Sequence, residues 1–139
     1  MSDLLIDTDV FSYVNGARPE AAIFRPLMQR RKVFLSFASV GEALAGARCK
    51  RWGEFRMGAL RQSLAELQVL HTSDAVVEAY SRLMEACERD GHALTHVPNR
   101  MDAWIAATAI AHNMPLLTNN LRHFRGTPGL SLIEHEEVT

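Results

Sequence analysis

Short runs of apolar residues alternate along the chain with longer helical stretches. The apolar runs predict five buried strands, at residues 4–6, 33–37, 67–70, 114–118 and 130–133. Helices are expected between them, at residues 40–51, 54–66, 73–89 and 99–112. Strands that alternate with helices are typical of a parallel sheet covered on both faces. The pattern therefore predicts an α/β fold, a three-layer α/β/α sandwich around a central, mainly parallel sheet of four to five strands.

Composition adds limits to this picture. The 139 residues contain no repeat, low-complexity segment or linker, so a single domain over residues 1–139 is expected. Cys49 and Cys87 lack metal-type and disulfide-type spacing and are expected to be buried. The first residues lack the basic segment of a signal peptide, and no apolar run approaches the roughly 18 to 20 residues of a membrane span. Together these features predict a cytoplasmic protein that makes no membrane contact.

Charge is distributed unevenly along the chain. Residues 18–61 contain ten Lys or Arg and three acidic residues, a net charge of +7, whereas the remainder has five basic and thirteen acidic residues, a net charge of −8. A basic segment attached to an acidic remainder suggests a track for a polyanion beside an acidic site. Alternatively, these basic residues are only the solvated faces of two helices. The sequence leaves both interpretations open.

Three acidic residues stand where strands end or helices begin. Asp7 directly follows the first strand, Glu42 follows the second, and Asp102 lies in the first turn of the last helix. Each also has a purely structural interpretation. Asp7 is a candidate helix cap, Ser39-x-x-Glu42 has the form of a capping box, and Asp102, third after an N-cap at Asn99, would complement the helix dipole.

Their combination favours a metal site. In a parallel sheet, these positions converge on the crevice at the carboxyl ends of the strands. Clustered carboxylates repel one another, and a cation between them relieves that repulsion. Oxygen ligands select Mg²⁺ or Mn²⁺ over softer metals. Thr118 and Asn120, after the fourth strand, are candidates to complete the ligand set or to position water, although a polar turn is the simpler explanation of these residues taken alone.

Three stretches of the sequence resemble the PIN-domain family, and within it the VapC-type toxins of bacterial type II toxin–antitoxin pairs. They are LLIDTDVFSY at the start, SFASVGEAL around Glu42, and MDAWIAATAIAHNMPLLTNNLRHF near the end. The resemblance implies a PIN-like α/β/α nuclease domain. It matches Asp7, Glu42 and Asp102 to the three core acids of the family and Thr118 to its site threonine. The family's fourth acidic position falls on Asn120, which has no charge.

This resemblance implies a Mg²⁺-dependent ribonuclease, with Mn²⁺ as a substitute, that hydrolyses RNA phosphodiester bonds by metal-activated water. The expected catalytic residues are Asp7, Glu42, Asp102, Asn120 and Thr118, and all of these except Thr118 are expected metal ligands. Arg48 and Arg51 are expected to hold the RNA backbone. The expected partners are the RNA substrate, a VapB-like antitoxin and a second copy of the chain in a homodimer.

Two other functions are consistent with the same residues. Asp7-Thr-Asp9 after an apolar strand also suits a haloacid-dehalogenase-like phosphatase with Asp7 as nucleophile. Those enzymes need a lysine after a late strand and a further acidic pair, whereas the two lysines here are Lys32 and Lys50. The remaining alternative is a catalytically silent module that binds RNA or protein.

Overall fold

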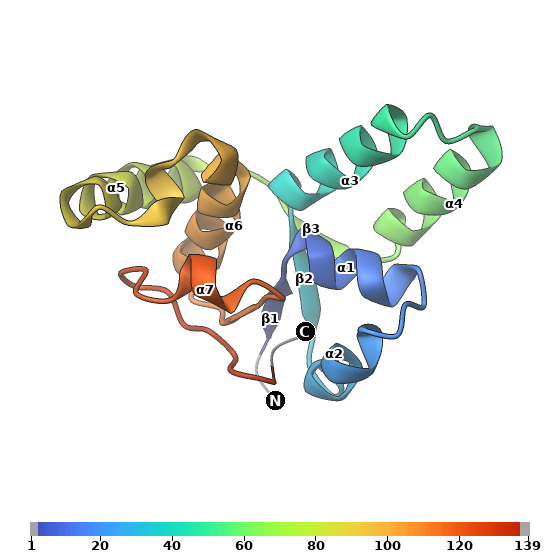
Figure 1. The fold of residues 1–139 in the computed structure, drawn as a ribbon, viewed down its shortest axis with the longest axis horizontal. Coiled ribbons are helices and arrows are strands. Elements are labelled where there is room, and N and C mark those ends of the chain that lie inside the picture. The colour runs from blue at the N-terminus through green and yellow to red at the C-terminus, as the bar shows by residue number, and fades with distance from the viewer. Residues whose placement is uncertain (1–2, 137–139) are drawn as a thin grey trace.

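Four short parallel strands form the centre of the molecule (Figure 1). They are β1 (Leu4–Ile6), β2 (Val33–Ser36), β3 (Gln68–Leu70) and β4 (Leu116–Leu117), in the spatial order β3-β2-β1-β4. The computed structural model describes residues 3–136 of the chain. The predicted parallel sheet is confirmed within that range.

Helices cover both faces of this sheet. On one side lie α1 (Thr8–Asn15), α2 (Ala21–Met28), α3 (Phe37–Cys49) and α4 (Glu54–Ala65), and on the other α5 (Asp74–Asp90), α6 (Arg100–Ala111) and α7 (Leu121–Phe124) (Figure 1). Two single-turn helices, η1 (Ala93–Thr95) and η2 (Val97–Asn99), connect α5 to α6. The predicted three-layer sandwich is therefore confirmed.

Each face of the sheet has its own hydrophobic core. Because successive strand residues point to opposite faces, Leu5 packs with the core of α5 and α6, whereas Leu4 and Ile6 pack with Phe11 and Phe24 of α1 and α2. Alanines fill most of the buried face of α6, which permits close approach to the sheet. The two cores fix the strand ends from which the acidic residues project.

Two elements differ from the sequence prediction. Helix α2 was not expected, and it contains Pro26, a residue that normally disfavours a helix interior. Burial of Ala21 and Phe24 on its inner face outweighs that penalty. The expected fifth strand is reduced to a single parallel bridge between Leu116 and Leu132, because only the two residues of β4 are available to pair with it.

Helix starts account for further corrections. Helix α3 begins at Phe37, with Ser36 as its N-cap, so Glu42 is the sixth helical residue and the predicted Ser39–Glu42 capping box is wrong. Asn99 does precede α6, but its side chain donates to the carbonyl of Ala93 (2.9 Å) instead of capping the helix.

Cysteine burial, membrane segments and the single domain were also predicted from the sequence. Cys87 is buried, but Cys49 is exposed at the end of α3, so the prediction that both are buried is wrong for Cys49. No helix in residues 3–136 is long and apolar enough to cross a membrane. The single domain stays a prediction, and its outermost residues, 1–2 and 137–139, lie outside the described part of the chain.

Candidate active site

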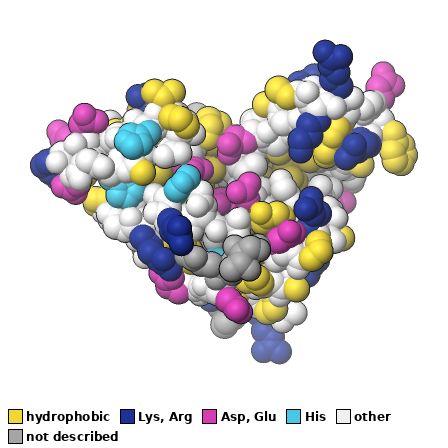
Figure 2. Space-filling view, viewed as in Figure 1, with side chains coloured by type: hydrophobic (Ala, Val, Ile, Leu, Met, Phe, Trp, Pro, Cys, Tyr) yellow, Lys and Arg dark blue, Asp and Glu magenta, His cyan; other side chains and the backbone are white. Residues whose placement is uncertain are grey.

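The acidic residues singled out in the sequence lie at the carboxyl ends of the central strands. Asp7 follows β1 directly, Glu42 projects from α3 after β2, and Asp102 lies in the first turn of α6. The face in Figure 2 is notched between an arm formed by α3 and α4 and an arm formed by α5 and α6, and acidic side chains gather at the base of the notch.

Asp7 is the most deeply buried of these acids, with 4% of its surface exposed. One carboxylate oxygen accepts a hydrogen bond from the backbone N–H of Val10 (2.9 Å) and caps α1, while the other accepts the hydroxyl of Thr118. Burial raises the pKa of Asp7 from 3.8 to about 7, against the lowering effect of these two hydrogen bonds. Its protonation state therefore depends on what lies near it at neutral pH.

Glu42 is held by α1. Its Oε1 accepts a hydrogen bond from Thr8 Oγ1 (2.6 Å), and the same Thr8 hydroxyl lies 2.9 Å from Ser39 Oγ. Partial burial raises the pKa of Glu42, and the Thr8 hydrogen bond acts in the opposite direction. Thr8 thus fixes a carboxylate that is 34 residues away in sequence.

Asp102 contacts a small polar network from the segment after β4. His123 Nδ1 lies 3.5 Å from Asp102 Oδ2 and 2.7 Å from Asn120 Nδ2. Burial raises the pKa of Asp102, and its contact with His123 lowers it. Because the amide nitrogen of Asn120 faces His123, the amide oxygen is the atom of that side chain that could bind a cation.

The carboxylates lie near enough for the charge of one to raise the pKa of another. The negative charge of Asp102 raises the pKa of both Asp7 and Glu42. Asp9, which is exposed on α1, raises the pKa of Asp7, Glu42 and Asp102. Like charges that raise one another's pKa are the arrangement that a bound cation would stabilise.

The donor set fits a hydrated Mg²⁺ better than a fully dehydrated ion. Within residues 3–136, no three His, Cys, Asp or Glu side chains are close enough together to hold one ion directly. Mg²⁺, however, usually keeps several waters and needs only one or two carboxylates from the protein. The oxygen atoms of Asp7, Glu42, Asp102 and Asn120 suit such an ion. The two carboxylate oxygens of Asp7 that accept hydrogen bonds each retain further acceptor capacity.

Several residues that hold this site were not identified from the sequence. Thr8 and His123 contact Glu42 and Asp102, and His135 Nε2 contacts the backbone carbonyl of Thr118 (2.5 Å). The ring of His135 also packs edge-on against Phe24 (5.0 Å between centroids). Thr8 stands beside Asp7 in the sequence, which is a weak signal, but nothing local indicates that His135 reaches Thr118.

The predicted RNA-contacting arginines lie away from the acids. Arg48 is in the last turn of α3, and Arg51 is in the turn that joins α3 to α4, with a left-handed backbone (φ 58°). Both are exposed. Basic side chains gather over the α3–α4 arm in Figure 2, so the basic segment and the acidic notch share one face of the molecule.

Comparison with known proteins identifies the family. A model of the PIN domain matches residues 4–130, and the chain therefore belongs to the PIN domain family. It is 23% identical over 123 residues to the protein named Ribonuclease VapC1 from Haemophilus influenzae strain R2866, which covers 87% of this chain and 89% of that protein. The expected resemblance to the PIN-domain family and its VapC-type members is confirmed.

Solved structures agree with this assignment. A crystal structure of VapBC2 from Rickettsia felis bound to a promoter DNA fragment superimposes with a TM-score of 0.79 at 23% identity, covering 98% of this chain and 100% of that one. A DNA-bound VapBC from Salmonella typhimurium gives a TM-score of 0.78 at 25% identity, covering 96% and 98% respectively. The likeness spans almost the whole length of both chains.

Proposed function

We propose that this chain is a Mg²⁺-dependent ribonuclease and the toxin of a VapBC-type toxin–antitoxin pair in the cytoplasm, with Mn²⁺ as an alternative cation. The placement of Asp7, Glu42 and Asp102 at the same end of the sheet, where the charge of Asp102 raises the pKa of the other two, is the observation that carries this proposal. Membership of the PIN domain family and the ribonuclease named among the relatives support it.

Asp7, Glu42, Asp102 and the amide oxygen of Asn120 would hold the cation. A bound Mg²⁺ supplies positive charge that stabilises the negative charge developing on the phosphate oxygens and activates water. Thr118 orients Asp7 through its hydroxyl, and Thr8 orients Glu42. These contacts hold both carboxylates in place before substrate arrives, which lowers the cost of reorganisation during the reaction.

Glu42 is the side chain best suited to accept a proton from the attacking water. It is only partly buried, so water reaches it. Asp7 is less accessible, and its role is to bind the cation. A covalent intermediate is not needed, because water displaces the leaving oxygen directly.

The proposed protein partner is a VapB-like antitoxin. Two of the similar structures described above are of VapBC complexes. A basic antitoxin side chain inserted among the carboxylates would form charge-assisted hydrogen bonds with them. The proposal also includes a homodimer of this chain, which is what its resemblance to VapC-type toxins implies.

The test is RNA cleavage with Mg²⁺ by the wild type, Asp7→Asn and Asp102→Asn. Each substitution removes one negative charge and keeps the shape of the side chain, so cleavage should fall at least a hundredfold. The matched control is Asp90→Asn at the exposed end of α5, which should cleave like the wild type. Undiminished cleavage by both site variants would rule out this active site.

The phosphatase and the silent binding module make different predictions. A phosphatase of the haloacid-dehalogenase type would form an aspartyl-phosphate on Asp7, yet both oxygens of that buried carboxylate already accept hydrogen bonds. Phosphate trapped covalently on Asp7 would favour that enzyme. A binding module would retain RNA affinity and show no cleavage with Mg²⁺ or Mn²⁺.

A further inference from the structure

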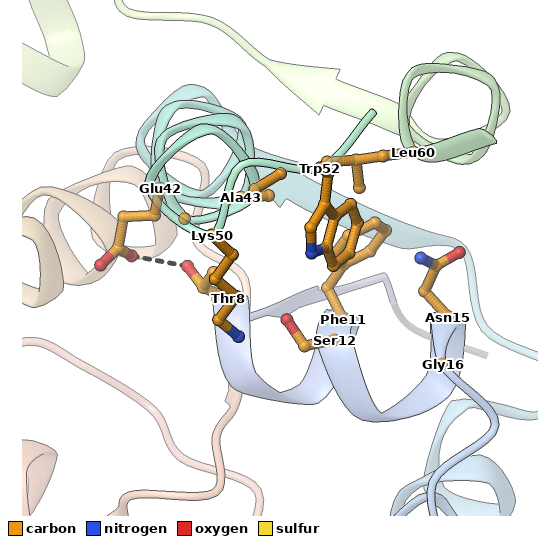
Figure 3. A pocket seen from close by; sticks show the side chains of 12 residues that line it. Thr8, Phe11, Ser12, Asn15, Gly16, Glu42, Ala43, Lys50, Trp52 and Leu60 are labelled. Atoms are coloured by element: carbon orange, nitrogen blue, oxygen red, sulfur yellow. Dashed lines mark hydrogen bonds between the residues drawn. The ribbon is translucent and has the colours of Figure 1, made fainter. Parts of the chain in front are cut away.

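A pocket of about 180 Å³ opens beside the acidic site, between α1, α3 and the start of α4 (Figure 3). Thr8 and Glu42 form one side of it and also belong to the acidic site. The pocket is therefore continuous with the place where the phosphodiester bond would be cleaved. None of the chemistry described above uses it.

The pocket lining combines an aromatic wall with a polar rim. Phe11 and Trp52 supply apolar surface, while Ser12, Asn15 and Lys50 supply hydrogen-bonding groups, and all five surround the same space in Figure 3. A flat heteroaromatic ring would match this lining, because its faces are apolar and its edges carry hydrogen-bond donors and acceptors. Unpaired RNA bases are commonly recognised by this combination of aromatic contact and edge hydrogen bonds.

Trp52 also contacts a cation outside the pocket. The guanidinium of Arg56 lies over the indole ring, 3.9 Å from its centroid. Arg56 does not line the pocket, whereas Trp52 does. The guanidinium thus covers part of one indole face, and a ligand would contact the part of Trp52 that lines the pocket.

Small residues on α3 keep the pocket open. Ala43, Gly46 and Ala47 lie at the spacing of one helix face and form its floor. A methyl group added at Gly46 would meet no atom within 4 Å. Because Gly46 lines the pocket, a larger side chain there would extend into open space at the pocket.

Charge favours a nucleic acid as the source of the ligand. Lys50 lines the pocket itself, and the exposed Arg48 and Arg51 flank it in sequence at the end of the α3–α4 arm. If the phosphates of an RNA strand follow this arm, one phosphate would reach the acidic site. A base next to that phosphate would then lie at the pocket, between the arm and the acidic site. A volume of about 180 Å³ is on the scale of one base.

We infer that this pocket binds a single base next to the scissile phosphate, and that it makes the affinity for RNA depend on the identity of that base. The inference rests on the proposed ribonuclease function. It adds a subsite in which Trp52 contacts the face of the base, and Ser12 and Asn15 contact its edge. Lys50 pairs with the adjoining phosphate.

Gly46→Leu tests the subsite by filling it. Leucine favours a helix more than glycine does, and the open space at Gly46 lets the variant fold. The matched control is Gly58→Leu in α4, where a side chain also meets nothing within 4 Å and which does not line the pocket. Circular dichroism and thermal unfolding verify that both variants keep the fold.

Binding is measured without divalent cations, using 2′-O-methyl octanucleotides of A, C or U and an abasic octamer with the same backbone. Quenching of Trp52 fluorescence reports occupancy of the pocket, with Trp52→Phe identifying the signal from Trp104. The wild type and Gly58→Leu should bind at least one of the base-containing octamers ten or more times more tightly than the abasic octamer. Gly46→Leu should lose that preference and keep the weaker, salt-dependent binding to the backbone.

Two results would overturn the inference. One is equal affinity of the wild type for base-containing and abasic octamers. The other is an unchanged preference in Gly46→Leu, which would leave a protein side chain as the better candidate for the pocket. The binding assay contains no divalent cation, so its result does not depend on the nuclease chemistry. Failure of the proposed nuclease function would appear separately, as base-dependent binding with no hydrolysis of unmodified RNA in Mg²⁺.

Discussion

Asp7 serves two purposes with its two carboxylate oxygens. One oxygen caps α1 by accepting from Val10, and the other faces Thr118 at the acidic site. Capping requires only an acceptor, which asparagine also supplies. The negative charge is therefore not needed for the fold, and its burial raises the pKa to about 7 at the expense of stability.

Asp7→Asn should stabilise the metal-free protein at pH 8 while it abolishes cleavage. Because the folded pKa lies above the unfolded one, the stability from protonated Asp7 is complete below about pH 3.8 and is lost as the pH rises to about 7. The corresponding upper limit is roughly 4 kcal/mol. Urea unfolding between pH 5 and 8 should show a steeper decline with pH for the wild type than for the variant. A variant less stable than the wild type at pH 8 would contradict this account of Asp7.

At the scale of elements, local pattern predicted the central architecture well. The run Leu4–Ile6 is apolar and buried at every position, and Val33–Ser36 is apolar up to its last residue, so both mark their strands clearly. Helix α2 was missed because its proline signals a break, and only tertiary burial of Phe24 makes the helix favourable. The start of α3 was misplaced because Ser36 and Ser39 are equally plausible caps by sequence.

The site was predictable only in part, because some of its residues act through tertiary contacts. Asp7 and Asp102 stand out because one directly follows a strand and the other lies in the first turn of a helix, whereas Glu42 lies inside α3. The residues that orient them act across long separations, as Thr8 does for Glu42, and local sequence carries no record of such contacts. The pocket beside Trp52 likewise forms from α1, α3 and α4 together.

The α3–α4 arm should contribute the salt-dependent part of RNA binding. In the double variant Arg48→Gln/Arg51→Gln, two exposed positive charges are lost. If each contacts one phosphate, the slope of log Kd against log salt concentration should fall by about 1.4, at roughly 0.7 per contact for a single strand. Titrations of the abasic octamer at several salt concentrations measure this slope. Arg82→Gln on α5, where Arg82 pairs with Glu78 (2.9 Å), is the matched control. An unchanged slope would mean that these arginines are only a solvated surface.

The whole molecule places opposite charges on one face. The base of the notch carries the carboxylates, and the α3–α4 arm beside it carries the basic residues (Figure 2). A polyanion attracted by the arm would be repelled at the notch unless a cation neutralised the acids there. Substrate binding and cation binding should therefore support each other, and the carboxylates should oppose folding when no cation is present.

Mg²⁺ should accordingly stabilise the folded protein, and more strongly at pH 8 than at pH 5. At the lower pH, protonation of Asp7, whose pKa is about 7, removes the charge that attracts the ion. At pH 8, a Mg²⁺ concentration one hundred times its Kd should add about 2.7 kcal/mol to the free energy of unfolding. Thermal unfolding with MgCl₂, compared with NaCl at matched ionic strength, measures the effect. Asp102→Asn should lose most of it, and Asp90→Asn should keep it. If Mg²⁺ raises the unfolding temperature of the wild type and of Asp102→Asn equally, the ion binds elsewhere and the carboxylates of the notch are not its site.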